Sequence, residues 1–480
     1  MRRYRYVFLN LIITIFISLC SIGCCGCLKK FLNSKCNNTS TKEENEIKGE
    51  NHSEIKGKEN KEKDKEEDLL IEKRKKYFEG VETIKEQYDK CNKTQDLTKY
   101  KIDNDEFKNN NNLKKIFEEV NKVVNEEDRI FIQSDTEGKV FNITSALQIA
   151  NIIDTKNPII VYYNFYNGNF EKNESENSIK LKLFEVNKNF NGTYIHLGDI
   201  VDRCNGDYQC LKSLLLILYI KQKLGNKVKL ICGNHELMYI NCQPACDCCY
   251  HNPWGDGDDK RIHFITRLIC LTAISKGQIQ YLDQIKIGKI NYILTHKVLY
   301  NKDNKKDVEQ IKYFLQNKMN VKTDLKNYGI YDLIKVVNDN FKKYFCDFFY
   351  NYDKKNKTKN SGIIEYTYPF DHLYTESNPK KEEHIVFGNR IKYVGYDNCL
   401  KNQICGHDHH EIGECYIEQM NILFVDNYSF VLETYKQAGH QKPMVNIHFF
   451  DKNEELSKHK AFNIINDEGK LEIKIVDNFC

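Results

Sequence analysis

Polar residues of types that bind metal ions follow a series of apolar runs along the chain. The stretches are "RIFIQSDTEG", "TYIHLGDIVDRC", "KVKLICGNHEL", "INYILTHKV" and "QICGHDHHEIG". Taken singly, a pair such as Asp199 and Asp202 is compatible with a helix cap, and His235 with a satisfied core histidine. Their succession favours a metal centre instead, because carboxylates mixed with imidazoles suit Mn, Fe or Zn. A carboxylate that bridges two ions would assemble a two-metal site.

Each polar cluster is expected at the end of a β-strand. Apolar runs that end in turn residues are typical of strands. Between the second and third runs, "YQCLKSLLLILYIKQKLG" has the length of a helix, and Gly225 stands where a C-terminal cap belongs. Strands alternating with a helix predict an α/β domain, in which ligands bind beyond the carboxyl ends of the strands.

The motifs "GDIVDRC", "GNHE", "LTH" and "GHDH", in this order, resemble those of the calcineurin-like metallophosphoesterase superfamily. The arginine in "GDIVDRC" makes the phosphoprotein phosphatases and the diadenosine-tetraphosphate hydrolases the most similar branches. The motifs span roughly residues 128 to 430. The resemblance implies an α/β fold: a layered β-sandwich core of two mixed sheets flanked by helices, here preceded by a disordered N-terminal stalk.

The resemblance also implies two divalent metal ions, Mn, Fe or Zn, and assigns their ligands. Expected for the first ion are Asp135, Glu137, Asp199 and His409. Expected for the second are Asp199, Asn234, His296 and His407, so that Asp199 bridges the two.

Catalytic roles follow from the same resemblance. His235 would protonate the leaving alkoxide and would be oriented by Asp202, while Arg203 would hold the substrate phosphate. These residue types suit the chemistry, because a metal-activated hydroxide is a strong nucleophile at neutral pH and a guanidinium binds phosphate oxygens bidentately.

The predicted function is a metal-dependent phosphoesterase, specifically a phosphomonoesterase similar to the phosphoprotein phosphatases. Its partner would be a phosphorylated substrate, either a protein or a small molecule. Two alternatives stay open: a nucleotide phosphodiesterase or pyrophosphohydrolase, and an exported binding protein that keeps the fold without turnover.

Two positions depart from the family pattern. The family's first motif ends Asp-x-His-Gly, whereas this chain has Glu137 in place of the histidine. A carboxylate can ligate the same ions, which favours retained metal binding with an altered metal preference. The second departure is Cys204, which stands where the phosphatases have glycine.

Composition and charge limit how the chain can be organised. Hydrophobic residues make up 40% of 480 residues, which fits one catalytic domain with appendages. The formal net charge of +4 is too small to indicate a nucleic-acid partner. The Lys- and Glu-rich residues 29–110 predict a low-complexity linker. Residues 111–450 would form the metallophosphoesterase domain, and residues 451–480 a C-terminal tail packing on it.

Two polar stretches within the domain, near residues 154–190 and 301–384, are interpreted as insertions. The second contains "LIKVVNDNFKKYFCDFFY", which is long and apolar enough for a helix. This helix would serve either as part of a lid or as core.

Export is predicted by the N-terminus. Residues 1–28 combine a basic flank with an apolar run and read as a signal peptide or a signal anchor, with membrane attachment through residues 7–28 in the second case. The protein would then be in the secretory pathway, extracellular or membrane-anchored. Nineteen cysteines fit this compartment. Two interpretations of the cysteine cluster stay open: Cys242, Cys246, Cys248 and Cys249 would form loop disulfides, or they would hold a structural zinc ion together with His251.

Overall fold

The computed structural model of the chain describes residues 64–76, 95–96, 129–175, 177–201, 207–241, 258–299, 309–313, 315–316, 320–355, 400–406, 416–425, 443–458, 460–467 and 470–477. Contacts divide the chain into Met1–Asp64 and Lys65–Cys480, and the elements below belong to the second unit. Among the described helices, none combines the length and the apolar character needed to span a membrane. The predicted export segment, residues 1–28, lies outside the described residues.

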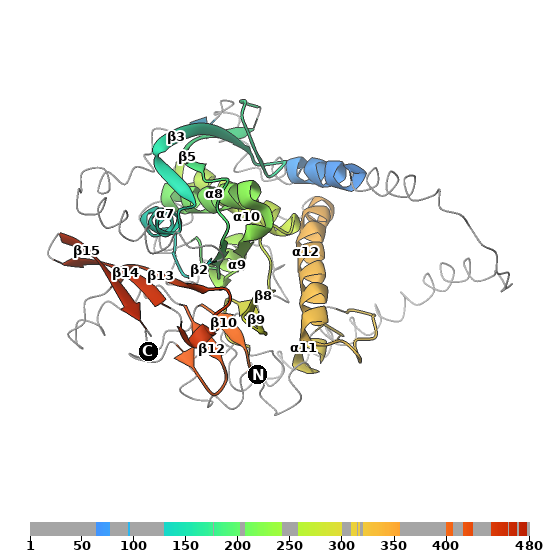
Figure 1. The fold of residues 1–480 in the computed structure, drawn as a ribbon. Helices are drawn as coiled ribbons and strands as arrows, with labels where there is room; N and C mark the ends of the chain where they lie inside the picture. The colour runs from blue at the N-terminus through green and yellow to red at the C-terminus, as the bar shows by residue number, and fades with distance from the viewer. Residues whose placement is uncertain are drawn as a thin grey trace, which may run out of the picture. The chain divides into compact units, whose positions relative to one another are not determined.

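A six-stranded sheet carries the first three predicted polar clusters (Figure 1). Its order is β15 (Lys470–Asp477), β14 (Lys460–Asp467), β13 (Pro443–Asp451), β2 (Arg129–Gln133), β6 (Thr193–His196) and β7 (Val228–Leu230). Strands β2, β6 and β7 are parallel neighbours, so their carboxyl ends meet at one edge of the sheet. Strands β14 and β15 come from the predicted C-terminal tail and extend this sheet through β13.

A five-stranded sheet carries the other two clusters. Its order is β11 (Tyr416–Ile417), β12 (Ile422–Phe424), β10 (Gln403–Cys405), β9 (Ile290–Thr295) and β8 (Asp283–Ile287). Strand β10 runs parallel to both β9 and β12. Side chains of this sheet, including Leu294 and Ile404, share one buried apolar cluster with Ile132 and Ile195 of the six-stranded sheet. The two sheets therefore pack against each other through apolar side chains.

Three strands of a third sheet, β3 to β5, come from the stretch interpreted as the first insertion. Its order is β1 (Gln95–Asp96), β5 (Ser178–Val186), β3 (Ile153–Asn164) and β4 (Asn169–Glu171). Although the segment is rich in polar residues, Tyr163 and Leu181 are fully buried in the larger hydrophobic core. Apolar side chains alternate with polar ones in β5, so one face packs inward while Lys182 and Glu185 stay exposed.

Helices form the other large part of the core. They are α7 (Val140–Ile149), α8 (Asp207–Leu224), α9 (Asn234–Asn241), α10 (Asp258–Ser275), α11 (Glu309–Tyr313) and α12 (Ile330–Lys355), with 3-10 turns at Gly225–Lys227 and Leu456–Lys458. The predicted helix before Gly225 is confirmed as α8, and Gly225 has φ +58°, which is the left-handed conformation of a C-terminal cap. Helix α10 packs against α8 and α12.

Helix α12 confirms the predicted helix in the second insertion and shows what it packs against. Phe341 and Phe345 are buried in the main core. The Asn338 side chain accepts hydrogen bonds from the backbone N–H groups of Tyr281 and Leu282 and donates one to Leu282 O. Of the two interpretations of this helix, lid or core, the packing supports core.

Within residues 29–110, interpreted as a low-complexity linker that is disordered or partly helical, residues 64–76 form a helix. The Arg74 guanidinium is fully buried and donates to Tyr166 O at 2.8 Å and to Ser275 Oγ at 2.9 Å. Leu70 and Ile71 pack against the main core. The charged composition hid this helix, because a few well-placed side chains make its contacts.

These sheets and helices together form a mixed α/β architecture, as the alternating pattern predicted.

Candidate metal centre

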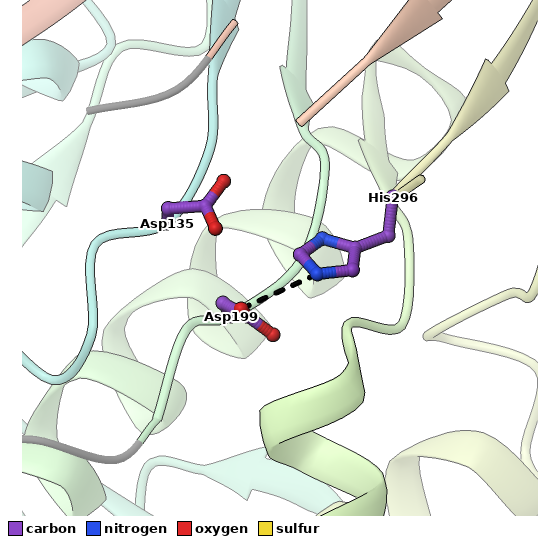
Figure 2. A group of neighbouring side chains, drawn as sticks. All are labelled: Asp135, Asp199 and His296. Atoms are coloured by element: carbon purple, nitrogen blue, oxygen red, sulfur yellow. Dashed lines mark ion pairs between the residues drawn. The ribbon is translucent and has the colours of Figure 1, made fainter. Parts of the chain in front are cut away.

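The five apolar runs that precede the polar clusters are confirmed as strands β2, β6, β7, β9 and β10. Asp135, Asp199 and Asn234 follow the three parallel strands of one sheet, and His296 follows β9 of the other. Side chains of the two sheets share one buried apolar cluster, and the ends of these strands lie near one another. Figure 2 shows the Asp135, Asp199 and His296 side chains directed toward one another from three separate segments.

Asp135, Asp199 and His296 form a buried cluster that could hold a metal ion. One ligand atom of each lies within 4.8 Å of the others. His296 Nε2 is 3.3 Å from Asp199 Oδ2, the pair joined by the dashed line in Figure 2. The Asp199 side chain is 1% exposed, so its charge is largely removed from water. Burying a pair of carboxylates is costly unless hydrogen bonds or positive charge compensate for it.

The hydrogen bonds of His296 fix which nitrogen faces the cluster. Nδ1 lies 2.8 Å from Leu197 O, and a carbonyl oxygen only accepts, so Nδ1 carries the proton. When the ring is neutral, Nε2 carries the lone pair, and it lies 2.8 Å from Asn234 Oδ1 and 3.3 Å from Asp199 Oδ2. A metal ion bound here would take this lone pair and the two oxygens as ligands.

Left-handed backbone marks the turns that carry the acidic residues. Eight non-glycine residues among those described have positive φ, and the three that are not asparagine are Asp135 (52°), Glu137 (47°) and Asp199 (55°). Such angles are uncommon for these residue types and concentrate at functional sites. Backbone hydrogen bonds hold the two turns together, from Asp135 N to Gly198 O at 3.0 Å and from Glu137 N to Asp199 O at 2.8 Å.

Gly233 lets the turn after β7 approach Asp199. A Cβ atom built on Gly233 would overlap Asp199 Oδ1 and the Asp199 backbone nitrogen. The next residues are thereby close enough for His235 N to donate to Asp199 Oδ1 at 2.9 Å. Only glycine fits at this position, because any larger residue would displace the Asp199 carboxylate.

Glu236 is a site residue that the sequence reasoning missed. Its side chain is fully buried, and its two oxygens accept backbone N–H groups from Asp199, Ile200, Val201 and Gly233 at 2.7 to 3.1 Å. Burial and the charge of Asp199 raise the pKa of Glu236, whereas the N–H donors of Val201 and Gly233 lower it. The available signal was its place in "GNHE", where a glutamate one residue after the proposed acid has no catalytic task of its own.

His235, the predicted general acid, lies at the same centre. It is 3% exposed, and its Nε2 is 3.5 Å from Asp199 Oδ2. The first turn of α9 therefore delivers both Asn234 and His235 to Asp199.

Glu137 is buried but is not part of the three-residue cluster found among the described residues. Its Oε2 lies 3.7 Å from Lys139 Nζ, and the lysine side chain is 40% exposed. Its expected role as a ligand of the first ion stays a prediction.

Several predicted site residues lie outside the described residues: Asp202, Arg203, His407 and His409, together with Cys204, Cys242, Cys246, Cys248, Cys249 and His251. Gly406, which directly precedes His407 in the sequence, lies against Ser134 and Asp135. The carboxyl end of β10 thus reaches the metal centre.

Cysteine chemistry is observed at one described position. Cys210 in α8 is disulfide-bonded, whereas Cys232, Cys270, Cys346 and Cys405 are not part of a disulfide. This agrees with the expectation that some of the cysteines form disulfides.

Comparisons with known proteins found structural neighbours only. No family model matches the chain, and no curated protein does. A cold-active protein-tyrosine phosphatase of a psychrophilic Shewanella species is 14% identical, with coverage of 72% of this chain and 80% of its own and a TM-score of 0.32. A Saccharomyces cerevisiae protein serine/threonine phosphatase with similarity to human phosphatase PP5 is 13% identical, with coverage of 75% and 87% and a TM-score of 0.33. Both neighbours are phosphatases, but TM-scores of this size do not establish a shared fold.

Proposed function

We propose that the protein is a metal-dependent phosphoesterase whose metal centre is built on Asp135, Asp199, Asn234 and His296. The observation that carries this proposal is the close approach of three possible ligand atoms. His296 Nε2 lies 2.8 Å from Asn234 Oδ1 and 3.3 Å from Asp199 Oδ2. A divalent cation bound among them would take the lone pair of the neutral imidazole and the two oxygens as ligands.

The donor set fits a divalent ion of the transition series. Two carboxylates, one amide oxygen and one imidazole nitrogen suit Mn, Fe or Zn better than Ca or Mg, which prefer oxygen alone. His296 has the further hydrogen bond that metal-binding histidines require, from Nδ1 to the Leu197 carbonyl. Two ions, with Glu137, His407 and His409 as additional ligands, belong to the proposal, as does the packing of the two sheets as a β-sandwich.

The chemistry proposed is hydrolysis of a phosphate ester. A bound divalent ion would supply Lewis acidity for a phosphoryl oxygen and would lower the pKa of water. His235 would hold the proton for the leaving oxygen, since its backbone N–H is bound to Asp199 Oδ1 and its Nε2 faces the same carboxylate. Asp202 would orient His235, and Arg203 would grip the phosphate.

The proposed substrate is a phosphate monoester, of a protein or of a small molecule. We place the activity in the secretory pathway or outside the cell, which the disulfide-bonded Cys210 supports.

Hydrolysis of p-nitrophenyl phosphate with added Mn²⁺ tests the function. The intact protein should release p-nitrophenol, a chelator should abolish the release, and Asp199→Asn should reduce it to background. Bis(p-nitrophenyl) phosphate should be a poorer substrate, and the reverse preference would favour a phosphodiesterase. If the metal-loaded protein is no more active than Asp199→Asn on either ester, the proposal fails.

One observation favours the second candidate, a binding protein without turnover. Glu137 stands where the resemblance expects histidine, and its carboxylate pairs with Lys139 at 3.7 Å. Under this alternative the native protein binds metal without hydrolysis, and Glu137→His gains activity. Under the proposed function the native protein is active before any substitution.

A further inference from the structure

His196 is a buried histidine at the carboxyl end of β6 to which no task has been assigned so far. It is fully buried, and its two ring nitrogens contact two different segments. Nδ1 lies 3.3 Å from the Gly198 backbone nitrogen, and Nε2 lies 3.1 Å from Thr136 Oγ1. The ring therefore spans from the turn that carries Asp199 to the turn that carries Asp135.

The hydrogen bonds fix the protonation of this ring. Gly198 N–H can only donate, so Nδ1 carries a lone pair, and the single proton of the neutral ring is on Nε2, which donates to Thr136 Oγ1. Burial and the nearby His296 lower the pKa of His196 to about 3, although Asp199 acts in the opposite direction. The ring accordingly stays neutral and keeps this tautomer at neutral pH.

Thr136, the partner of His196 Nε2, lies in the middle of the turn that carries Asp135 and Glu137. It is fully buried and stands between Asp135 and Glu137, both of which have left-handed backbone angles. Through the Thr136 hydroxyl, His196 at the end of β6 can therefore hold in place the strained turn that carries Asp135 and Glu137.

We propose that His196 is a positioning residue for the metal centre, which sets the spacing of the Asp135 and Asp199 turns through its hydrogen bond to Thr136. The inference rests on the proposed metal binding and goes beyond it, because neither His196 nor Thr136 is a ligand. Hydrogen bonds behind the ligands typically change metal affinity by about 10- to 100-fold when they are removed.

Substitutions at Thr136 separate the hydrogen bond from packing. Thr136→Val keeps the shape and removes the hydroxyl, whereas Thr136→Ser keeps the hydroxyl and removes a methyl group. Affinity for Mn²⁺ is measured by calorimetry on the full chain, and folding is checked by thermal unfolding without metal. We expect Val to weaken Mn²⁺ binding about tenfold or more and Ser to stay within about threefold of the native protein. Packing alone predicts the opposite order, and that order would overturn the proposal.

Substitutions at His196 provide the matching control. His196→Gln can place an amide N–H near the position of Nε2 and should restore most of the affinity, while His196→Asn is too short to reach Thr136 and should not. Combining Thr136→Val with His196→Asn should cost little more than either change alone, because both remove the same bond. Additive losses would contradict the proposal. If the native protein binds no Mn²⁺, the proposed function fails instead, and the two failures are thereby distinguishable.

Discussion

Backbone strain and buried charge coincide at Asp135, Glu137 and Asp199, where each acidic residue has a left-handed φ. Strain of this kind costs on the order of 1–3 kcal/mol per residue and persists only when surrounding contacts enforce it. Here Glu236 supplies much of the enforcement, because it accepts four backbone N–H groups from the turns after β6 and β7.

Replacing Glu236 by glutamine should destabilise the fold while preserving its shape. The new amide group would direct N–H donors at backbone donors, and one unsatisfied buried group costs about 1–3 kcal/mol. Chemical denaturation of the metal-free protein measures this loss. Glu185→Gln removes the same charge from an exposed position and should change the free energy of unfolding by less than about 0.5 kcal/mol. Equal effects of the two changes would contradict the conclusion that the Glu236 side chain holds these turns in place.

His235→Asn should lower kcat and leave metal binding intact. Loss of a general acid costs about 10²- to 10⁴-fold, and the cost depends on how much the leaving oxygen needs a proton. We therefore expect a large decrease for phenyl phosphate and a smaller one for p-nitrophenyl phosphate, whose leaving group is more acidic. The same decrease for both esters would show that His235 does not donate the proton.

The resemblance of the motifs implied Asp135, Asp199, Asn234 and His296 as ligands, and the structure brings these side chains together. Only the place of Glu236 in "GNHE" pointed to that residue, and no sequence feature pointed to His196. Their importance depends on which groups meet their side chains, and those contacts join turns that are far apart in sequence.

At the scale of elements, the site depends on close approach between strand ends. Gly233→Ala should weaken Mn²⁺ binding strongly, because the added Cβ overlaps Asp199 Oδ1. Gly225→Ala is the matched control: this glycine has φ +58° but nothing within 4 Å of its added Cβ. The control should cost about 1–2 kcal/mol of stability and leave metal affinity unchanged. Calorimetry and thermal unfolding of both variants test this, and equal metal affinities would contradict it.

Helix 64–76 should detach when Arg74 is replaced. Arg74→Ala removes the hydrogen bonds to Tyr166 O and Ser275 Oγ and leaves a cavity beneath the helix. Hydrogen exchange should then lose protection in residues 64–76 while α8 and α10 keep theirs. Lys76→Ala, at a side chain that is 51% exposed, is the control and should change neither. Retained protection in Arg74→Ala would show that Leu70 and Ile71 suffice.

Elements differ in how far their sequences predict them. The runs that became β2, β6, β7, β9 and β10 are apolar and end in turn residues, so local pattern was enough. The stretch that became β3 to β5 was interpreted as an insertion because of its polar residues, and helix 64–76 was interpreted as linker because of its charges. In both, a minority of apolar or buried side chains determines the structure, and their partners are distant in sequence.

At the scale of the molecule, two sheets share an apolar cluster, and their parallel strands end at the same centre. Alternating strands and helices predicted the mixed α/β class. The sequence could not show which strands would form each sheet, since that is decided by pairing between strands distant in sequence, such as β13 with β2 and β9 with β10.

Titration of the metal-free protein with Mn²⁺, followed by calorimetry, tests the central claim most directly. We predict saturable binding to the native chain and loss of that binding in both Asp199→Asn and His296→Ala, with the fold retained by circular dichroism. Absence of binding to the native chain, or binding by both variants as tight as that of the native chain, would contradict the assignment of Asp135, Asp199, Asn234 and His296 as a metal centre.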